Sequence, residues 1–203
     1  MKYQLGDFVS QTPGSSMQPP PEDQIIRPYP AQYIWECRLK DGTPVTIRPI
    51  RPEDEPLMVQ FHATLSERSV YLRYFCSLSL RTRVEHERLV RICFPNYEHG
   101  FALVADRENP QTGKHEILGV GRFSAIDDDE AEVAVLVSDQ WQGRGLGMEL
   151  VAAVIRVARE EKFQRLSAEI LRDNLATQVL FKKAGFHLKL MSDPSSVSAL
   201  LTL

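Results

Sequence analysis

The chain has 203 residues, a formal net charge of −3 and a pI near 6.0, with 43% hydrophobic and 25% charged residues. This composition is ordinary for a globular protein and allows one domain of about 150 to 170 residues plus a tail. The acidic balance argues against general nucleic-acid binding, which is typical of strongly basic domains. No basic segment followed by an apolar run marks a signal peptide, and no apolar stretch reaches the roughly 18 residues of a membrane helix. We therefore expect a cytoplasmic protein without a membrane partner.

Residues 1–35 hold six of the 13 prolines and are predicted to form an extended tail or linker. The aromatic residues at its end, Tyr29, Tyr33 and Trp35, are suited to docking on a folded domain. Residues 36–203 are predicted to form that single domain.

Two strands and three helices are predicted next. The strands, residues 35–39 and 43–48, are joined by Asp41-Gly42, a dipeptide typical of tight hairpin turns. The helices cover residues 52–65, 66–75 and 79–93. The third helix carries four arginines interspersed with glutamates, which favours a solvated helix face, with a protein-contacting surface as the alternative: Arg81, Arg83, Arg88 and Arg91.

The rest of the chain alternates strands with two further helices. Six strands are predicted, at residues 101–106, 116–125, 130–138 and 166–171 and near 187–191 and 197–203, the last two being short. The helices are a strongly amphipathic one at residues 145–162 and a second at residues 174–184, which ends at Gly185. This order predicts an α/β or α+β fold with helices and one sheet in three layers.

A glycine-rich turn, Gln142-Gly143-Arg144-Gly145-Leu146-Gly147, lies between a predicted strand and the amphipathic helix. Glycines allow backbone N–H groups to approach a ligand closely, and a helix N-terminus adds partial positive charge. We therefore predict a pyrophosphate site, with Arg144 as an additional positive charge and a ligand-free loop as the alternative. Met148 replaces the third glycine of a dinucleotide-binding fingerprint, and the chain has no P-loop GK[ST] sequence.

At this point the sequence resembles the GNAT N-acetyltransferase family. Gln142 to Gly147 matches the family signature Q/R-x-x-G-x-G/A, and Asn174-Leu-Ala176 with Phe181-Lys-Lys-Ala-Gly185-Phe186 is similar to its second cofactor motif. Residues 43–54 and 65–75 further resemble the acetyltransferase domain of Pat-type protein lysine acetyltransferases, which modify acyl-CoA synthetases. The resemblance implies a single domain with a mixed, mostly antiparallel sheet, helices on both faces, and a splayed strand pair that holds acetyl-CoA.

The resemblance also implies roles for individual residues. Backbone groups of Leu136 and Val137 would pair with the pantetheine arm, amides of residues 143–148 would hold the pyrophosphate, and Asn174 and the helix face with Phe181 would line the far side of the cofactor. The implied cofactor-binding set is Leu136, Val137, Gln142, Gly143, Arg144, Gly145, Leu146, Gly147, Met148, Asn174 and Phe181. Family members often have a tyrosine in place of Phe181 that protonates the leaving thiolate, which phenylalanine cannot do.

An amine acceptor requires a base, because a lysine amine with an ordinary pKa near 10.4 is mostly protonated at neutral pH. Strand alternation places Glu130 and Glu132 on one face of residues 130–138, with Glu132 well inside the strand. We expect burial to raise the pKa of Glu132 towards that of a working base. Related protein acetyltransferases have their base at the matching place, and Glu169 on the next strand is the reserve candidate.

Three functions remain open from the sequence. The first is acetylation of protein lysines, such as those of acyl-CoA synthetases; the second is acetylation of a small amine or an antibiotic; the third is a non-catalytic acyl-CoA sensor. We expect no metal, because Cys37, Cys76 and Cys93 are widely spaced and the histidines form no ligand pattern. The sequence predicts no oligomeric state.

Overall fold

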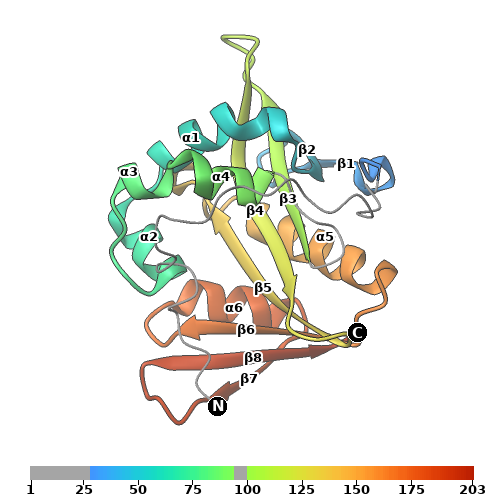
Figure 1. Cartoon of the computed structure of the whole chain (residues 1–203), viewed down its shortest axis with the longest axis vertical. Coiled ribbons are helices and arrows are strands. Elements are labelled where there is room, and N and C mark those ends of the chain that lie inside the picture. The colour runs from blue at the N-terminus through green and yellow to red at the C-terminus, as the bar shows by residue number, and fades with distance from the viewer. Residues whose placement is uncertain (1–27, 94–99) are drawn as a thin grey trace, which may run out of the picture.

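The computed structural model describes residues 28–93 and 100–203. Eight strands form one sheet in the order β1-β2-β3-β4-β5-β6-β8-β7 (Figure 1). The strands are β1 (Trp35–Arg38), β2 (Pro44–Pro49), β3 (Gly100–Glu108), β4 (His115–Ala125), β5 (Glu130–Val137), β6 (Arg165–Leu171), β7 (His187–Leu190) and β8 (Ser196–Thr202). The α-helices are α1 (Glu55–Ala63), α2 (Glu67–Tyr74), α3 (Leu80–Arg83), α4 (His86–Cys93), α5 (Leu146–Glu160) and α6 (Leu175–Lys183), and short 3-10 turns are η2 (Ala31–Tyr33), η3 (Pro52–Asp54) and η4 (Asp139–Trp141).

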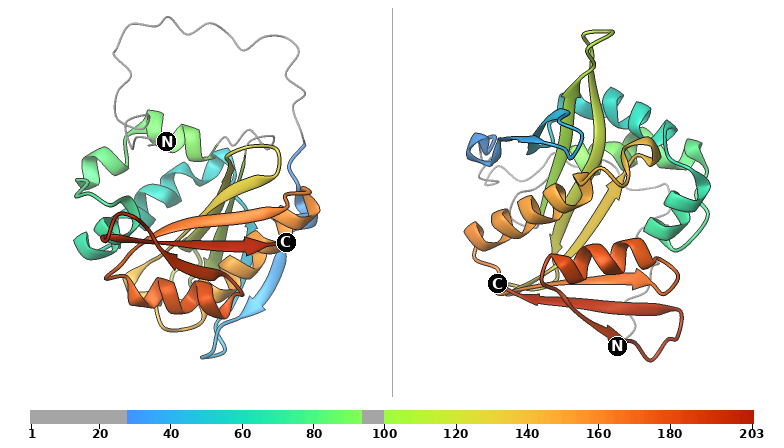
Figure 2. Two further views of the ribbon diagram at one scale, coloured as in Figure 1. Left: turned by 90° about the horizontal axis from the view of Figure 1, so that it is seen from below. Right: turned by 180° about the vertical axis from the view of Figure 1, so that it is seen from behind.

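The helices cover both faces of the sheet, as the sequence predicted. The helices α1 to α4 lie in front of the strands in Figure 1, whereas α5 and α6 lie in front in the view from behind (Figure 2). The long helix α5 approaches β4 closely at Gly119 and Gly121. A Cβ at Gly119 would lie 2.9 Å from Leu150 Cδ1, and one at Gly121 would lie 3.1 Å from Val154 Cγ2. Glycine is therefore required there to seat α5 on the sheet.

All strand pairs are antiparallel except β5 and β6, which are parallel. The single mixed, mostly antiparallel sheet predicted from the sequence is therefore confirmed. The parallel pair arises because α5 connects β5 to β6 across one face of the sheet. It also divides the sheet into a larger half, β1 to β5, and a smaller half, β6, β8 and β7.

The single helix predicted over residues 79–93 is wrong, because the chain forms α3 and α4 with a break at Val84 and Glu85. Arg83 is buried and holds the chain at this break. Its Nη1 donates to the carbonyl oxygen of His62 at 2.8 Å, in the last turn of α1, and its Nε donates to Leu78 O at 3.2 Å. The helix is thus interrupted by a contact with α1, which the local sequence pattern does not reveal.

The aromatic segment before β1 packs on the domain. Tyr33 is buried, its hydroxyl donates to Glu161 Oε1 at 2.9 Å, and its ring meets Phe101 edge-on at 5.4 Å. The Tyr29 hydroxyl donates to Pro49 O at 3.0 Å. The chain from Tyr29 onwards is therefore part of the fold, whereas residues 1–27 of the predicted tail lie outside the described residues.

Candidate active site

The strands β5 and β6 pair over only three residues and then separate. The parallel register runs from Glu130–Arg165 to Glu132–Ser167, and beyond it the two strands diverge into a fork (Figure 1). On its other edge β5 pairs with β4, where Ser138 N–H donates to Leu118 O at 2.9 Å. The fork therefore leaves one edge of the second half of β5 without a strand partner.

The backbone groups in the fork belong to alternate residues of β5. Ile126 N–H donates to Glu130 O at 2.8 Å, so the hydrogen-bonded pairs of the β4–β5 ladder fall on the even-numbered residues of β5. Beyond the last β5–β6 pair at Glu132, the N–H and C=O groups of Val135 and Val137 consequently point into the fork. Such a row of groups suits an extended ligand that adds to the sheet edge like a strand.

This register corrects one of the predicted cofactor contacts. Leu136 pairs with Val120, and its backbone is directed to β4 rather than into the fork. Of the two predicted residues, only Val137 faces the fork, and its carbonyl oxygen already accepts from Gln142 Nε2 at 3.1 Å. Val135 is the fork-facing residue that the sequence analysis missed, because the sequence does not reveal which alternate residues bond to β4.

The glycine turn has the backbone shape that only glycine adopts freely. Gly143 and Gly145 have φ angles of 75° and 95°, and α5 begins at Leu146. A Cβ at Gly143 would meet no atom within 4 Å, so the backbone there borders open space. The N–H groups of a first helical turn have no acceptors within the helix, which leaves those of Leu146 and Gly147 available. The Met148 N–H, in contrast, donates to Gly145 O at 2.9 Å.

The β1–β2 hairpin holds the glycine turn from the side. Arg144 pairs with Asp41, with Nη1 2.9 Å from Oδ2, and its guanidinium lies 4.7 Å from the Trp141 ring centre. Lys40 N–H donates to Arg144 O at 3.1 Å, and the Lys40 side chain runs within 3.4 Å of a Cβ built on Gly145. Lys40 thus brings a second cation to the turn, which sequence spacing gave no sign of.

The same turn is fastened to α2 by Asp139. Its carboxylate accepts from Ser66 N–H at 2.9 Å, Ser66 Oγ at 2.6 Å and Ser69 Oγ at 3.0 Å. These hydrogen bonds outweigh burial and lower the pKa of Asp139. Gln142 Nε2 donates to Ser69 Oγ at 3.2 Å, so its side chain faces inward, and only its backbone is free to meet a ligand.

The two residues of the second motif have structural roles. Asn174 caps α6, with its Oδ1 accepting from Thr177 N–H at 3.2 Å. Phe181 is only 2% exposed and packs 4.7 Å from the Phe186 ring, so its side chain belongs to the core and does not line the cofactor face as predicted. The exposed apolar side chains of α6 are instead Leu175 and Val179.

Glu132 lies at the point where the fork opens. It shares the face of α1 to α4 with its register neighbours Ser124 and Ser167, and it is exposed, so the expectation of burial is wrong. The helices on this face pack against the Leu136 end of β5, while the small serines beside Glu132 leave its carboxylate uncovered. Glu169 is also exposed, two residues further along β6. The structure therefore places both candidate carboxylates on the same face.

Two of the cysteines are unsuited to nucleophilic catalysis. Burial raises the pKa of Cys93 to about 12 and also raises the pKa of Cys37. Both therefore remain protonated thiols at neutral pH, whereas the thiolate is the nucleophile. Cys76 is exposed on the connection between α2 and α3. Direct attack by the acceptor on a thioester needs no enzyme nucleophile and is the simpler route.

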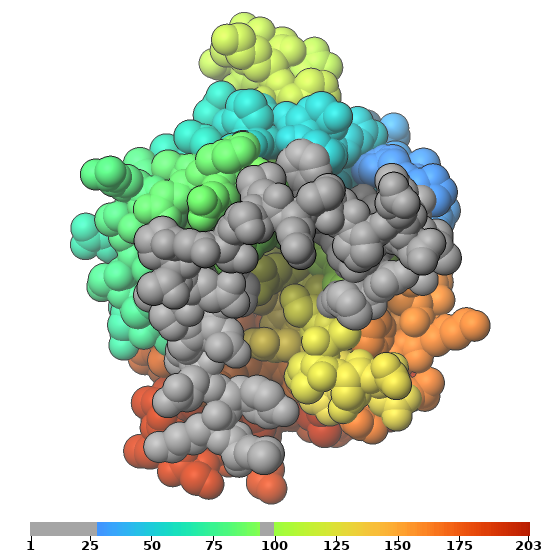
Figure 3. Space-filling model, viewed as in Figure 1, coloured from blue at the N-terminus to red at the C-terminus, as the bar shows by residue number. Residues whose placement is uncertain are grey.

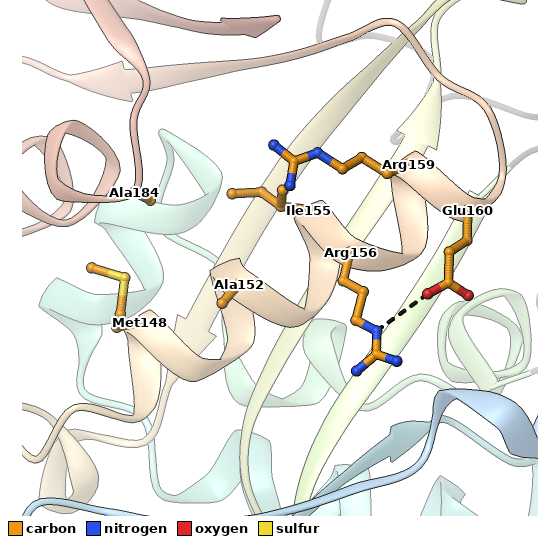
Figure 4. Close-up of a pocket in the computed structure, with 7 residues that line it drawn as sticks. All are labelled: Met148, Ala152, Ile155, Arg156, Arg159, Glu160 and Ala184. Atoms are coloured by element: carbon orange, nitrogen blue, oxygen red, sulfur yellow. Dashed lines mark hydrogen bonds and ion pairs between the residues drawn. The ribbon is translucent and has the colours of Figure 1, made fainter. Parts of the chain in front are cut away.

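An open depression with a volume of about 540 Å³ lies on the outward side of α5 (Figure 4). Its lining residues are Met148, Ala152, Ile155, Arg156, Arg159, Glu160 and Ala184. Arg156 Nε is 3.2 Å from Glu160 Oε1. Only Met148 among the predicted site residues borders this depression, so it is separate from the fork.

Within residues 28–93 and 100–203, no group of three or more metal-binding side chains is found. In the same part of the chain, no helix is long and apolar enough to cross a membrane.

Comparison with known proteins agrees with this geometry. The family model of the acetyltransferase (GNAT) domain matches residues 45–187, well over half of the chain. Acetyltransferase PA5475 from Pseudomonas aeruginosa is 29% identical over 153 residues, covering 75% of this chain and 80% of that protein.

Two further relatives carry the name Pat. Acetyltransferase Pat from Mycolicibacterium smegmatis is 27% identical over 161 residues, which are 79% of this chain but 45% of that longer protein. The crystal structure of the GNAT domain of S. lividans PAT matches with a TM-score of 0.78 and 29% identity, covering 87% of this chain and 100% of that domain. The sheet, the fork and the glycine turn thus occur in a chain that belongs to the acetyltransferase (GNAT) family.

Proposed function

We propose that this acetyltransferase transfers the acetyl group of acetyl-CoA to the ε-amino group of protein lysines, with acyl-CoA synthetases as the substrate class to test first. The observation that carries the proposal is the position of Glu132, an exposed carboxylate at the opening of the β5–β6 fork. Pantetheine would lie along the free edge of β5, with the pyrophosphate at the glycine turn. The thioester would then reach the fork beside Glu132.

The chemistry requires one base. The neutral amine attacks the thioester carbonyl, the new C–N bond forms, and the C–S bond breaks to release the CoA thiolate. Glu132 takes the proton that the amine loses, directly or through one water molecule. The leaving thiolate is a weak base compared with an alkoxide, so it can depart without a general acid at the position of Phe181.

Two observations favour a protein acceptor. Glu132 and Glu169 are both exposed on one face, which leaves room for a side chain presented by a large partner. The similarity to two proteins named Pat over at least three quarters of this chain points in the same direction. A small amine is the alternative acceptor, and a sensor without turnover is the third possibility.

Replacing Glu132 with glutamine tests the proposed base. The amide keeps the size of the side chain but cannot accept the proton, so turnover should fall by about 10² to 10⁴-fold. Acetyl-CoA affinity, measured by calorimetry, should change by less than roughly threefold, since the cofactor is held by other groups. Near-normal turnover of the variant would move the base elsewhere, and Glu169→Gln is the next variant to measure.

Acetylation of purified acyl-CoA synthetases and of the source proteome with labelled acetyl-CoA tests the acceptor. Labelled lysines that disappear with Glu132→Gln support the proposal. Labelled small amines without labelled protein would favour the alternative acceptor. Tight acetyl-CoA binding without any labelled product would favour a sensor.

A further inference from the structure

Three arginines from three elements meet on the face of the sheet that carries Glu132. Arg73 in α2 and Arg88 in α4 each place the guanidinium carbon 5.1 Å from the centre of the Tyr74 ring. Arg122 in β4 shares this face, because Arg122 pairs with Ala134 and lies one step along the ladder from Glu132. Helices α2 to α4 and strands β4 and β5 supply this face in Figures 1 and 3.

The arginine cluster consists of Arg73, Arg88 and Arg122. Among the described residues, no ion pair joins Arg73 or Arg88 to a carboxylate, and the negative charge of Glu132 acts on Arg73 and Arg122. Arg88 Nε is buried without a hydrogen-bond partner in the described structure. A buried donor left unpaired costs free energy, which an arriving acceptor atom would recover.

Burial acts on the same guanidinium groups. It lowers the pKa of Arg73 and of Arg122, and the charge of Arg122 lowers the pKa of Arg73 further. These cations are therefore partly stripped of water and repel one another. An anion that enters the cluster would form charge-assisted hydrogen bonds in a setting where such bonds are strong.

The face as a whole has a positive and a negative side. The arginine cluster lies on the α2, α4 and β4 side, and Glu132 and Glu169 lie towards β6. An acceptor that fits both sides presents an amine to the carboxylates and a negative charge to the arginines. A protonated lysine alone would be repelled by the cluster.

We propose that Arg73 and Arg88, with Arg122, bind a carboxylate close to the accepting amine, so that the preferred acceptor is a lysine with an acidic residue beside it. This specificity rests on the proposed function, since it concerns the same acceptor site. A purely structural cluster is the competing explanation. It would stabilise the α2–α4 packing on Tyr74 but would make turnover indifferent to charge next to the target lysine.

Matched peptides separate the two explanations. One peptide carries a glutamate next to a single lysine, and its control carries glutamine there. The wild-type enzyme should acetylate the acidic peptide with a kcat/KM at least about tenfold higher, the effect of one charge-assisted hydrogen bond. Arg73→Gln and Arg88→Gln should each reduce this ratio towards one, mainly through KM. The exposed residues of the same helices give the controls, Arg68→Gln and Arg91→Gln, which should keep the full ratio.

A charge reversal keeps the test decisive when a glutamine variant loses stability. Arg73→Glu should no longer prefer the acidic peptide. It should instead have the higher kcat/KM for a peptide with arginine at the same position. Acetyl-CoA binding and the melting temperature, measured on every variant, verify that the fold is intact. A structural cluster would lower the melting temperature without reversing the peptide preference.

The remaining outcomes distinguish this inference from the proposed function. Equal rates on both peptides, or an unchanged preference in Arg73→Gln and Arg88→Gln, would overturn the acidic specificity and leave lysine acetylation standing. If neither peptide reacts, free lysine and lysinamide become the acceptors. Acetylation of free lysine but not of lysinamide would support recognition of a carboxylate by the arginines and would overturn a protein as the acceptor. If neither compound reacts, or if both react equally, the assignment of the arginine cluster as a carboxylate site is overturned.

Discussion

His62 is an unusual residue of α1, since its imidazole is 1% exposed and neither ring nitrogen has a hydrogen-bond partner in the described structure. Burial, together with the charges of Arg83 and Arg88, lowers the pKa of His62 from 6.5 to about 4. The folded state thus holds this side chain neutral, while an unfolded chain takes up a proton below about pH 6.5. Between about pH 4 and 6.5, His62 therefore stays neutral only while the protein is folded, and it lies close enough to Arg88 of the arginine cluster to be affected by its charge.

The consequence is a loss of stability in acid. Because the pKa of His62 is lower in the folded state, its contribution is complete above pH 6.5 and disappears as the pH falls from 6.5 to about 4. The full loss is about 3 kcal/mol at 1.36 kcal/mol per pKa unit. Urea unfolding of the wild type and of His62→Leu across this range measures it. The slope should be shallower in the variant, and identical slopes would assign the acid sensitivity to other groups.

Gly143 gives a second prediction for a single residue. With φ at 75°, an alanine there should cost about 1 kcal/mol of stability. Its Cβ would meet no protein atom within 4 Å, so any larger effect must come from a ligand. Gly143→Ala should therefore fold and yet bind acetyl-CoA at least about tenfold more weakly by calorimetry, a change of about 1.4 kcal/mol. Unchanged affinity would place the pyrophosphate elsewhere.

At the scale of elements, a buried ion network ties β2 and β3 to η3. Arg48 donates to both oxygens of Asp54 at 2.7 Å and to Asp106 Oδ2 at 2.9 Å. All three side chains are less than a tenth exposed. This network fixes the start of α1 on the sheet, and α1 in turn supports the face that carries the arginine cluster.

Removing the cation leaves two buried carboxylates without the guanidinium and, among the described residues, with only the Arg51 N–H at 2.8 Å from Asp54 and His115 Nδ1 at 2.8 Å from Asp106. Arg48→Met should therefore cost about 3 to 5 kcal/mol in the free energy of unfolding, measured by guanidinium denaturation. The less buried pair Arg107–Glu116, whose side chains are 17% and 30% exposed, provides the control, since Arg107→Met should cost clearly less than Arg48→Met. Adding Asp54→Asn and Asp106→Asn to Arg48→Met should restore part of the stability. Equal costs for the two arginines would show that burial does not set the value of this network.

The sequence predicts elements well where local chemistry decides them. The hairpin at Asp41-Gly42 and the stop at Gly185, with φ at 98°, are both found. The break at Val84 and Glu85 was not predictable, because Arg83 meets a carbonyl of a different helix.

The candidate site follows the same division. The glycine turn is a local backbone feature that the sequence reveals. Strand alternation correctly placed Glu132 on the same face of β5 as the other even-numbered residues. Three properties depended on tertiary structure and were mispredicted: the exposure of Glu132, the burial of Phe181 and the direction of the Leu136 backbone. Alternation identifies the residues of a strand that share a face. Whether that face is covered depends on the helices packed on it, and which backbone groups point to a free strand edge depends on the ladder register.

For the whole molecule, the fork means that two halves of the sheet are joined by three residue pairs between β5 and β6. A cofactor lying in the fork would contact both halves and bind the folded state alone. At a hundredfold excess over its Kd it should stabilise the protein by about 2.7 kcal/mol. For a chain of this size, that corresponds to a rise in melting temperature of about 5 to 11 °C.

Differential scanning fluorimetry with acetyl-CoA measures this rise. An acetyl thioester that lacks the pyrophosphate and adenosine is the matched ligand control and should give a much smaller shift at the same concentration. Gly143→Ala should also reduce the shift produced by acetyl-CoA. A full shift with the truncated thioester would mean that the glycine turn contributes little to binding.

The position of β8 between β6 and β7 has a consequence for synthesis on the ribosome. The strands β1 and β2 pair with each other across a short turn, and so do β3 and β4, so these two hairpins can form as they emerge. The smaller half must wait, because β6 is made some 25 residues before its long antiparallel partner β8. During that interval the nascent chain exposes the unpaired edge of an apolar strand, which is the condition under which chains associate with one another. The residues Ser196–Thr202 therefore complete the pairing of β6, and a slow or stalled passage before them prolongs the exposure of its edge.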